Sequence, residues 1–355
     1  MVEGRMAAQL FDFVRAATRS ITGGAAIAGC LASALFGAMT GSSAASAAAL
    51  GRVIIPELDR LGYPRNFSAG LFAAGGTLGI MIPPSIVFVI YAALAKVSVT
   101  DMFIAGIVPG LFLTLLMVIL TATLAKRNGW GDRGAFSWLE VGSSLLGAGP
   151  ALLMPVLVLG GIYGGIFTPT EAAAIAAVYG IIVGGAYYRS VGFGSIHRIF
   201  SESAKMTAGV LFILAQALFI GMLANLAGIP QAIVDAIGGA DLGAWQFLII
   251  VNLVLLVLGC FLDGVTLLTV VTPLLLPSIR HLDIDLIHFG IILTLNIEIA
   301  AITPPIGINL FVISGVSKTP MEQVVRGVLP YGVMMLLALI FITYIPWLSL
   351  VLLRN

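Results

Sequence analysis

The chain has 355 residues, of which 60% are hydrophobic and only 9% are charged, and its net charge is +1. Soluble domains carry roughly 25% charged residues, so this composition excludes a soluble protein and predicts a helical bundle embedded in lipid. The sequence contains no basic patch with interleaved aromatic residues, which argues against nucleic-acid binding. It also contains no P-loop pattern, so ATP hydrolysis is not expected.

Residues 1–20 predict an amphipathic helix of the kind that lies at a membrane surface, with Leu10, Phe11 and Val14 on one face. Apolar runs near the ~20 residues that a crossing helix needs follow it. They are 66–93, 103–125, 145–165, 169–188, 203–227, 287–313 and 328–353.

Two further apolar runs, 24–56 and 245–279, are interrupted in the middle by GAMTGSS at 37–43 and by GCFLDG at 259–264. Each half is short for a crossing, so we interpret both runs as re-entrant hairpins. Non-helical backbone at membrane depth is tolerated only against protein or a water-filled cavity. With the first hairpin opening to the cytoplasm and the second to the outside, only Lys96, Arg280 and Arg354 of the 17 basic residues fall outside. This orientation agrees with the positive-inside bias, but full double crossings would give the same count.

One further local pattern is a capping box: Thr168 is the expected N-cap, Pro169 the first helical residue and Glu171 the third. We assign it a structural role, as the start of a crossing helix with a packing face of small residues at 172–177.

The two hairpins head two copies of one pattern, offset by 221 residues. Three crossings lie between the copies, and an odd number places the second copy upside down in the membrane. The sequence therefore predicts an all-α polytopic membrane protein with inverted repeats, two re-entrant hairpins and two broken transmembrane helices. Inverted repeats of this kind place substrate and ion at the midplane of secondary transporters. The matching pairs are Pro56 and Pro277, Pro83-Pro84 and Pro304-Pro305, Gly106 and Gly327, and Pro109 and Pro330.

We expect a single permease domain over 1–355. It comprises a first repeat at about 21–126, scaffold helices at about 140–228 and a second repeat at about 245–353.

The broken crossings are GTLGIMIPPS at 76–85 and IAAITPPIGIN at 299–309. Proline cannot continue a helix behind it but is tolerated in the first turn of a new one, so each proline pair should end one half-helix and start another. The first half leaves unpaired carbonyl oxygens that suit sodium, and the second half points its positive N-terminus at an anion. Hydroxyl groups beside the interruptions can complete either site, although serine and threonine also serve helix packing. They are Thr40, Ser42, Ser43, Thr77, Ser85, Thr266 and Thr303.

Three further polar residues, Asp263, Asn296 and Glu298, lie at expected membrane depth. Ionisable groups there are costly, and a functional role is the default expectation. The structural alternative for Asp263 is that it only caps a half-helix.

Several of these segments together resemble the DctM-like large membrane subunit of tripartite ATP-independent periplasmic (TRAP) transporters. They are LFGAMTGSSAASAAALG, GYPRNFSAGLFAAGGTLGIMIPPSIVFVIY, AGIVPG, GIFTPTEAAAIAAVYG and HFGIILTLNIEIAAITPPIGINLFVISG. The resemblance implies a sodium-coupled elevator-type symporter of the bacterial inner membrane that carries organic acids such as C4-dicarboxylates or sialic acid. It implies a small four-helix membrane subunit and a periplasmic solute-binding protein as partners, and no cofactor besides sodium as coupling ion.

Sodium binding in the family involves the hairpin tips and helix breaks. Carried over to this sequence, the resemblance points to Thr40, Gly41, Ser42 and Ser43, to the break from Thr77 to Ser85 with Gly79 and Pro83, to Asp263 and Gly264, and to the break from Thr303 to Gly307 with Pro305. Family members usually begin with two further helices, which this sequence lacks. The expectation is therefore either a misassigned start codon or a truncated protein.

Two alternatives remain. One is a single-component sodium/anion symporter of the same inverted-hairpin design. The other is an intramembrane enzyme using Asp263 and Glu298, which no paired-aspartate, HExxH or GxSxG motif supports. A channel would not need paired broken helices in inverted copies.

Overall fold

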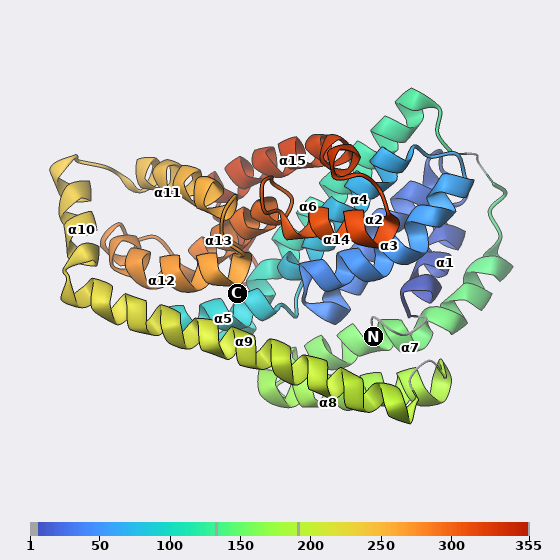
Figure 1. The fold of residues 1–355 in the computed structure, drawn as a ribbon, viewed down its shortest axis with the longest axis horizontal. Coiled ribbons are helices and arrows are strands. Elements are labelled where there is room, and N and C mark those ends of the chain that lie inside the picture. Colours follow the sequence, from blue (N-terminus) through green and yellow to red (C-terminus); the bar gives the residue numbers. More distant parts are fainter. Residues whose placement is uncertain (1–5, 132–133, 190–191, 354–355) are drawn as a thin grey trace.

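The computed structural model describes residues 6–131, 134–189 and 192–353, and all regular structure within these ranges is helical (Figure 1). The helices are α1 (Met6–Thr18), α2 (Gly24–Thr40), α3 (Ser43–Arg60), α4 (Arg65–Met81), α5 (Ile86–Ala95), α6 (Val99–Asn128), α7 (Trp138–Tyr163), α8 (Pro169–Ile182), the π-helical turn η1 (Val183–Tyr187), α9 (Phe193–Leu226), α10 (Ile229–Gly239), α11 (Ala244–Gly259), α12 (Gly264–His281), α13 (Leu286–Ala301), α14 (Ile308–Ser317), α15 (Met321–Tyr344) and α16 (Trp347–Leu350).

The four interruptions expected from the sequence are present, between α2 and α3, α4 and α5, α11 and α12, and α13 and α14. Both proline pairs, which have cis X-Pro bonds, lie in the non-helical connections rather than in the first turn of the following helix. Ser85 and Gly307 are the residues that cap α5 and α14. The prolines therefore end the first half-helix, as predicted, but do not begin the second.

Six helices within the described residues are long and apolar enough to cross a bilayer, or seven if α4 and α5, which are bent by 42°, count as one span. The protein is therefore a multi-pass membrane protein. One of the six is α12. The sequence predicted that this arm of the second hairpin would be too short to cross a bilayer, and its 18 residues show that this prediction of its length was wrong. Whether either hairpin is re-entrant stays a prediction.

One other boundary and one additional helix differ from expectation. The last crossing, predicted over 328–353, is α15 at Met321–Tyr344, because Pro346 ends the helix and only the short α16 follows. The short helix α10, at Ile229–Gly239, was not expected. Gly228 and Pro230 at its start are the N-terminal signal that could have revealed it.

The helices of the first copy have counterparts in the second, since α3, α4, α5 and α6 correspond in order to α12, α13, α14 and α15. The two copies pack reciprocally: α3 contacts α14, α12 contacts α5, and α4 contacts α13. Exchanging the copies maps this contact pattern onto itself. The reciprocity supports the predicted repeat, while its inversion across the membrane stays a prediction.

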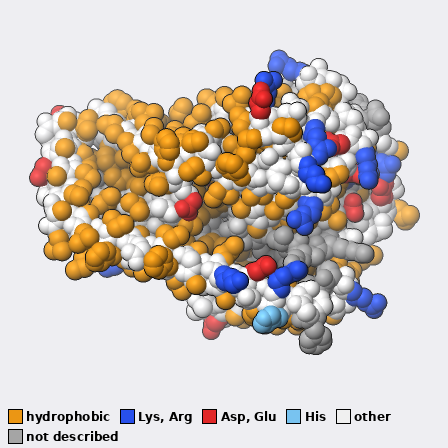
Figure 2. Space-filling view, in the orientation of Figure 1, with side chains coloured by type: hydrophobic (Ala, Val, Ile, Leu, Met, Phe, Trp, Pro, Cys, Tyr) orange, Lys and Arg blue, Asp and Glu red, His pale blue; other side chains and the backbone are white. Residues whose placement is uncertain are grey.

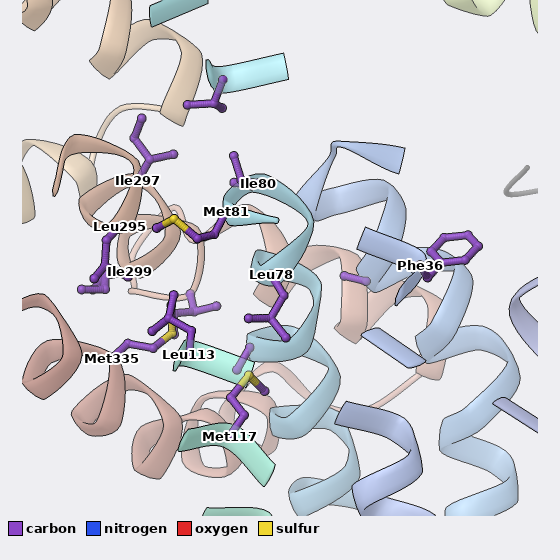
Figure 3. Close-up of a cluster of buried hydrophobic side chains, with 14 of the residues drawn as sticks. Phe36, Leu78, Ile80, Met81, Leu113, Met117, Leu295, Ile297, Ile299 and Met335 are labelled. Atoms are coloured by element: carbon purple, nitrogen blue, oxygen red, sulfur yellow. The ribbon is translucent and has the colours of Figure 1, made fainter. Parts of the chain in front are cut away.

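The hydrophobic core lies between the copies. Leu78 of α4, Leu113 of α6, Leu295 of α13 and Met335 of α15 meet there with at most 1% of their surface exposed (Figure 3). Each such side chain contributes roughly 1.5–3 kcal/mol when it is removed from water, and in lipid the close packing itself provides the attraction. The core therefore joins the two copies into one body.

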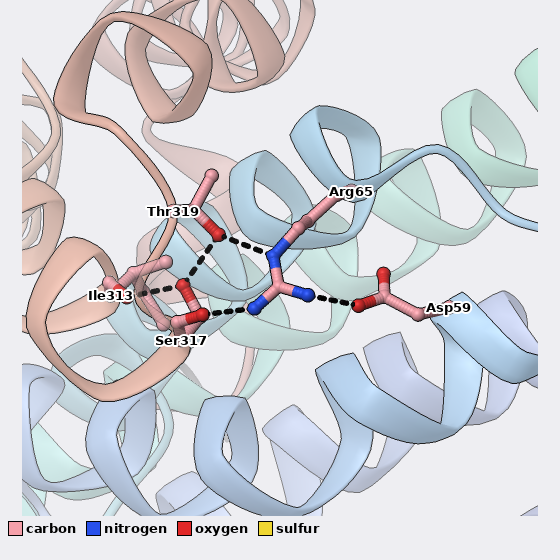
Figure 4. A network of polar contacts seen from close by, with 5 residues as sticks. All are labelled: Asp59, Arg65, Ile313, Ser317 and Thr319. Atoms are coloured by element: carbon pink, nitrogen blue, oxygen red, sulfur yellow. Dashed lines mark hydrogen bonds and ion pairs between the residues drawn. The ribbon is translucent and has the colours of Figure 1, made fainter.

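A polar cluster joins the copies at one end (Figure 4). Arg65 at the start of α4 donates from Nη1 to Asp59 Oδ2 at 2.6 Å and from Nε to Thr319 Oγ1 at 3.1 Å, and it also donates to the carbonyl of Ser317. Asp59 belongs to the first copy, whereas Ser317 and Thr319 lie at the junction of α14 and α15 in the second. We call these four residues the Arg65 clamp.

Helices α7, α8 and α9 lie along one side of this body, and α9 runs along the long edge of the molecule from α8 to α10 (Figure 1). Met206, Leu211 and Phe212 of α9 are more than half exposed. Figure 2 shows hydrophobic side chains over most of the visible face at the end formed by α9 to α12, while Lys and Arg gather toward the opposite end. An apolar surface of this extent requires lipid or another protein against it.

Two local predictions are confirmed. Helix α1 is amphipathic, and its Leu10, Phe11 and Val14 are buried against the neighbouring helices. The capping box is formed: the Glu171 amide donates to Thr168 Oγ1 at 3.3 Å, and the Thr168 amide donates to Glu171 Oε2 at 2.8 Å.

Candidate functional site

Both hairpin tips, the second helix break and the ends of α4 and α5 beside the first break border one cavity of about 310 Å³, which we call the central cavity. Helix α9 closes one side of it through Met206 and Val210. Segments far apart in the sequence thus converge as the repeat predicts. Six of the predicted site residues, from three of the interruptions, border this cavity: Gly41, Ser42, Ser43, Asp263, Gly264 and Gly307.

The first tip is pressed against the first break. Gly41 has a φ of 59°, a left-handed conformation that favours glycine, and a Cβ added there would lie 2.8 Å from the carbonyl oxygen of Pro84. Thr40 Oγ1 lies 2.7 Å from Ser46 Oγ, which fixes the Thr40 side chain to the next helix. Gly79 approaches the same tip, since a Cβ added to Gly79 would lie 3.1 Å from the Ser42 carbonyl oxygen.

The second tip is organised by Asp263, which caps α12. Its Oδ1 accepts from the amides of Val265 at 3.0 Å and Thr266 at 3.2 Å, and its Oδ2 accepts from the Thr266 hydroxyl. The structural role considered for Asp263 is therefore present. The residue also borders the central cavity, so the cap holds a carboxylate beside it.

The second tip also contacts its own break. The Ile306 amide donates to the Cys260 carbonyl at 3.3 Å, and a Cβ on Gly264 would lie 2.3 Å from Ile297 Cγ2. Each tip therefore fits closely against the broken helix of its own copy.

The link between the copies at the cavity is Asn309, which sequence reasoning did not select. Its Nδ2 donates to Ser43 Oγ at 2.6 Å and to the Ala73 carbonyl at 2.8 Å. Asn309 is fully buried and borders the central cavity. An amide side chain within the apolar run after Pro305 is the signal that could have found it.

Thr40 and Ser85 border a second cavity of about 290 Å³, on the other side of the first tip. Its far wall is formed by Met154 and Val158 of α7 and by Ala173, Ala176 and Ala177 of α8. Three of the small residues predicted at 172–177 therefore face the first tip and the first break. Among the described residues, the buried Ser85 Oγ has no hydrogen-bond partner.

Asn296 and Glu298 were predicted together but face different neighbours. Residues two positions apart on a helix point about 200° away from each other. Asn296 Nδ2 donates to Asn252 Oδ1 of α11 at 2.8 Å, and Asn252 in turn donates to Thr343 Oγ1 at 3.0 Å. Glu298 is fully buried beside Thr77 and Met81 of α4.

The remaining predicted residues lie near the breaks but border neither cavity. Thr77 is fully buried and donates to the Ala74 carbonyl at 2.7 Å. Thr303 donates to the Ile299 carbonyl at 2.6 Å. Pro83 is buried within the first break and Pro305 is exposed within the second.

The possible cation ligands around the central cavity are hydroxyl, carboxylate, amide and main-chain oxygens, the hard ligands that small cations prefer. Four of its bordering segments are N-termini of half-helices, α3, α5, α12 and α14, which favour an anion. No group of three or more His, Cys, Asp or Glu within the described ranges could hold a metal ion. The bordering oxygens can therefore ligate a cation, and the helix N-termini can face an anion.

A multi-pass helical protein whose interrupted helices converge on one cavity with a carboxylate, an amide and hydroxyl groups in its wall has the architecture of a secondary membrane transporter. The family model described as "Tripartite ATP-independent periplasmic transporter, DctM component" matches residues 1–348. The chain belongs to this family: it is a large permease subunit of a TRAP transporter, and a transporter component rather than an enzyme.

Similar proteins include the C4-dicarboxylate TRAP transporter large permease proteins of Pseudomonas aeruginosa and Vibrio cholerae. The first is 43% identical over 99% of this chain and 82% of its own length, and the second 41% identical over 98% and 82%. The isethionate TRAP transporter permease protein of Oleidesulfovibrio alaskensis is 37% identical over 98% of this chain and 55% of its own length.

Proposed function

We propose that this permease imports an organic-acid anion across the bacterial inner membrane, driven by a sodium gradient. The main observation behind the proposal is the convergence of both tips, the second break and the helix ends beside the first break on the central cavity. Oxygen donors for a cation and helix N-termini for an anion lie there within one small volume.

The anion is proposed to be a C4-dicarboxylate or a related carboxylate. Two relatives identical to this chain at more than 40% of positions carry C4-dicarboxylate in their names. The name of a more distant relative, isethionate permease, refers to a sulfonate. What these substrates share is a compact anionic group, which the half-helix N-termini would recognise.

The proposed partners are a periplasmic solute-binding protein, which delivers the anion, and a small membrane subunit of four helices. The family description names a tripartite transporter, which supports two components besides this one. The exposed apolar surface of α9 offers area for lipid or for the small subunit.

In the proposed cycle, sodium binds among the oxygen donors of the tips and breaks, and the anion binds beside it. The two copies then move together past α7, α8 and α9 and carry the cavity across the membrane. The shared core and the Arg65 clamp support movement of the copies as one body. Small residues on α8 would allow sliding at close distance.

Reconstitution tests the proposal. The full chain, the small subunit and the binding protein are placed in proteoliposomes, and uptake of labelled succinate is measured with an inward sodium gradient and after its collapse by an ionophore. Uptake should require the gradient. Uptake that continues after collapse would reject sodium coupling, and uptake without the binding protein would favour a single-component symporter.

A further inference from the structure

Asn309, in the first turn of α14, presents an oxygen whose partner is missing. Its Nδ2 donates to Ser43 Oγ and to the Ala73 carbonyl, and a backbone carbonyl can only accept a hydrogen bond. The amide therefore cannot be turned over without placing two acceptor oxygens 2.8 Å apart. This geometry fixes which end of the side chain is oxygen.

The Asn309 Oδ1 atom is buried and accepts no hydrogen bond from the residues that the structure describes. Leaving a buried acceptor without a partner costs about 1–3 kcal/mol, so a partner is expected in the working protein. Asn296 Oδ1 is also unpaired within the described ranges, but Asn296 does not border the central cavity and Asn309 does. Of these two unpaired amides, Asn309 is therefore the one whose residue forms part of the cavity wall.

The partner of Oδ1 must be a hydrogen-bond donor, such as water, or a cation. A carboxylate substrate offers only acceptor oxygens, which would repel Oδ1, whereas a small cation takes amide and hydroxyl oxygens as ligands. We propose that Asn309 Oδ1 is a ligand of the coupling cation, at the junction of the first tip and the second break. This inference rests on the proposed sodium coupling.

Such a site would connect the two copies. Ser43 belongs to the first copy and Asn309 to the second, and the hydrogen bond between them at 2.6 Å places the amide of one copy against the tip of the other. A cation bound by Oδ1 would stiffen this junction only when sodium is present. Occupation of the site and the shape of the central cavity are thereby coupled.

The test is sodium-dependent stabilisation of the purified full chain in nanodiscs, with choline replacing sodium at constant ionic strength. Thermal unfolding is recorded as sodium is increased, and the half-saturating concentration is read from the shift in melting temperature. In Asn309→Leu this concentration should rise at least tenfold. Asn309→Ala, which adds no bulk, should show the same shift and serves if the leucine variant does not fold.

The matched control is Asn252→Leu. Asn252 is a buried amide that bonds Asn296 and Thr343 away from the central cavity. Its replacement should lower the melting temperature and leave the half-saturating sodium concentration unchanged.

The outcomes separate the two proposals. If sodium stabilises the wild type and the Asn309 variants respond at the same concentration, the assignment of Asn309 is wrong while sodium coupling stands. If the variants keep their sodium response but lose stabilisation by succinate, the assignment of Oδ1 to the cation is wrong and the Asn309 side chain serves the substrate instead. If sodium does not stabilise the wild type at all, sodium coupling and this inference both fail.

Discussion

At the residue scale, Asp263 has two separable properties, the cap on α12 and a carboxylate charge beside the central cavity. The cap was the structural alternative expected from the sequence, and the hydrogen bonds to Val265 and Thr266 show it directly. Asparagine caps a helix about as well as aspartate. Substitutions can therefore remove the charge without removing the cap.

We expect the free energy of unfolding of Asp263→Asn to lie within a few tenths of a kcal/mol of the wild-type value. That of Asp263→Ala should be lower by about 1 kcal/mol. If the carboxylate binds sodium, both variants should need at least tenfold more sodium for half-maximal uptake. Thermal unfolding and uptake titrations measure the two effects separately.

Asp285 provides the control, since its Oδ1 caps α13 in the same way through the amides of Ile287 and His288 and it lies outside the central cavity. Asp285→Asn should leave the sodium requirement of uptake unchanged. An equal shift in both asparagine variants would contradict a specific ion role for Asp263.

At the element scale, each tip depends on close approach to its break. The sequence could place the interruptions because proline and glycine act locally on the backbone. It could not show that the first tip touches Pro84 or that Asn309 reaches Ser43, since these contacts depend on how distant helices pack. The candidate site was therefore predictable as a set of segments but not as a set of contacts.

Gly41→Ala should reduce uptake strongly and destabilise the fold by more than the roughly 1–2 kcal/mol of a left-handed residue, because its Cβ would also meet the Pro84 carbonyl. Gly62 has a φ of 79°, but a Cβ added there would have no neighbouring atom within 4 Å. Gly62→Ala should therefore show the conformational cost alone and keep normal uptake. Thermal unfolding and uptake assays compare the two variants, and equal losses in both would mean that the fit of tip to break is unimportant.

The Arg65 clamp joins elements of the two copies. Arg65→Met should destabilise the protein by about 1–3 kcal/mol, because charge-assisted hydrogen bonds to Ser317 and Thr319 are lost. Arg326 forms an exposed pair with Glu322 one helical turn away, so Arg326→Met should cost at most about 0.5 kcal/mol. Thermal unfolding in nanodiscs compares the two, and similar small losses would show that the clamp does not fasten the copies.

At the scale of the whole molecule, the inverted repeat predicts the orientation of each copy in the membrane. Arg60 and His281 are equivalent positions in the two copies, 221 residues apart, and both are exposed. If the copies are inverted, these positions lie on opposite sides of the membrane.

In a background with Cys30 and Cys260 replaced by serine, we expect Arg60→Cys to react with an impermeant maleimide only after the membrane is opened. His281→Cys should react in intact spheroplasts. Labelling of both variants from the same side would reject the inversion and, with it, the meeting of two oppositely directed half-helices.

The sequence by itself determined the class of protein, the position of each helix interruption and the presence of two copies. These features follow from composition and from residues that act on their own backbone, such as Pro83-Pro84 and Gly41. Sequence reasoning assigned Asn296 and Glu298 to one site, although their spacing of two residues on one helix already points them in different directions.

Only the tertiary structure decided which interruptions meet and which hydrogen bonds join them. It placed Ser43 against Asn309 and paired Asn296 with Asn252, which in turn bonds Thr343. It also set Thr40 and Ser85 toward α7 and α8 rather than toward the central cavity. The physical reason is that a break in a helix is a local property of the chain. The partner of each exposed polar group is instead set by the packing of helices that lie up to 266 residues apart.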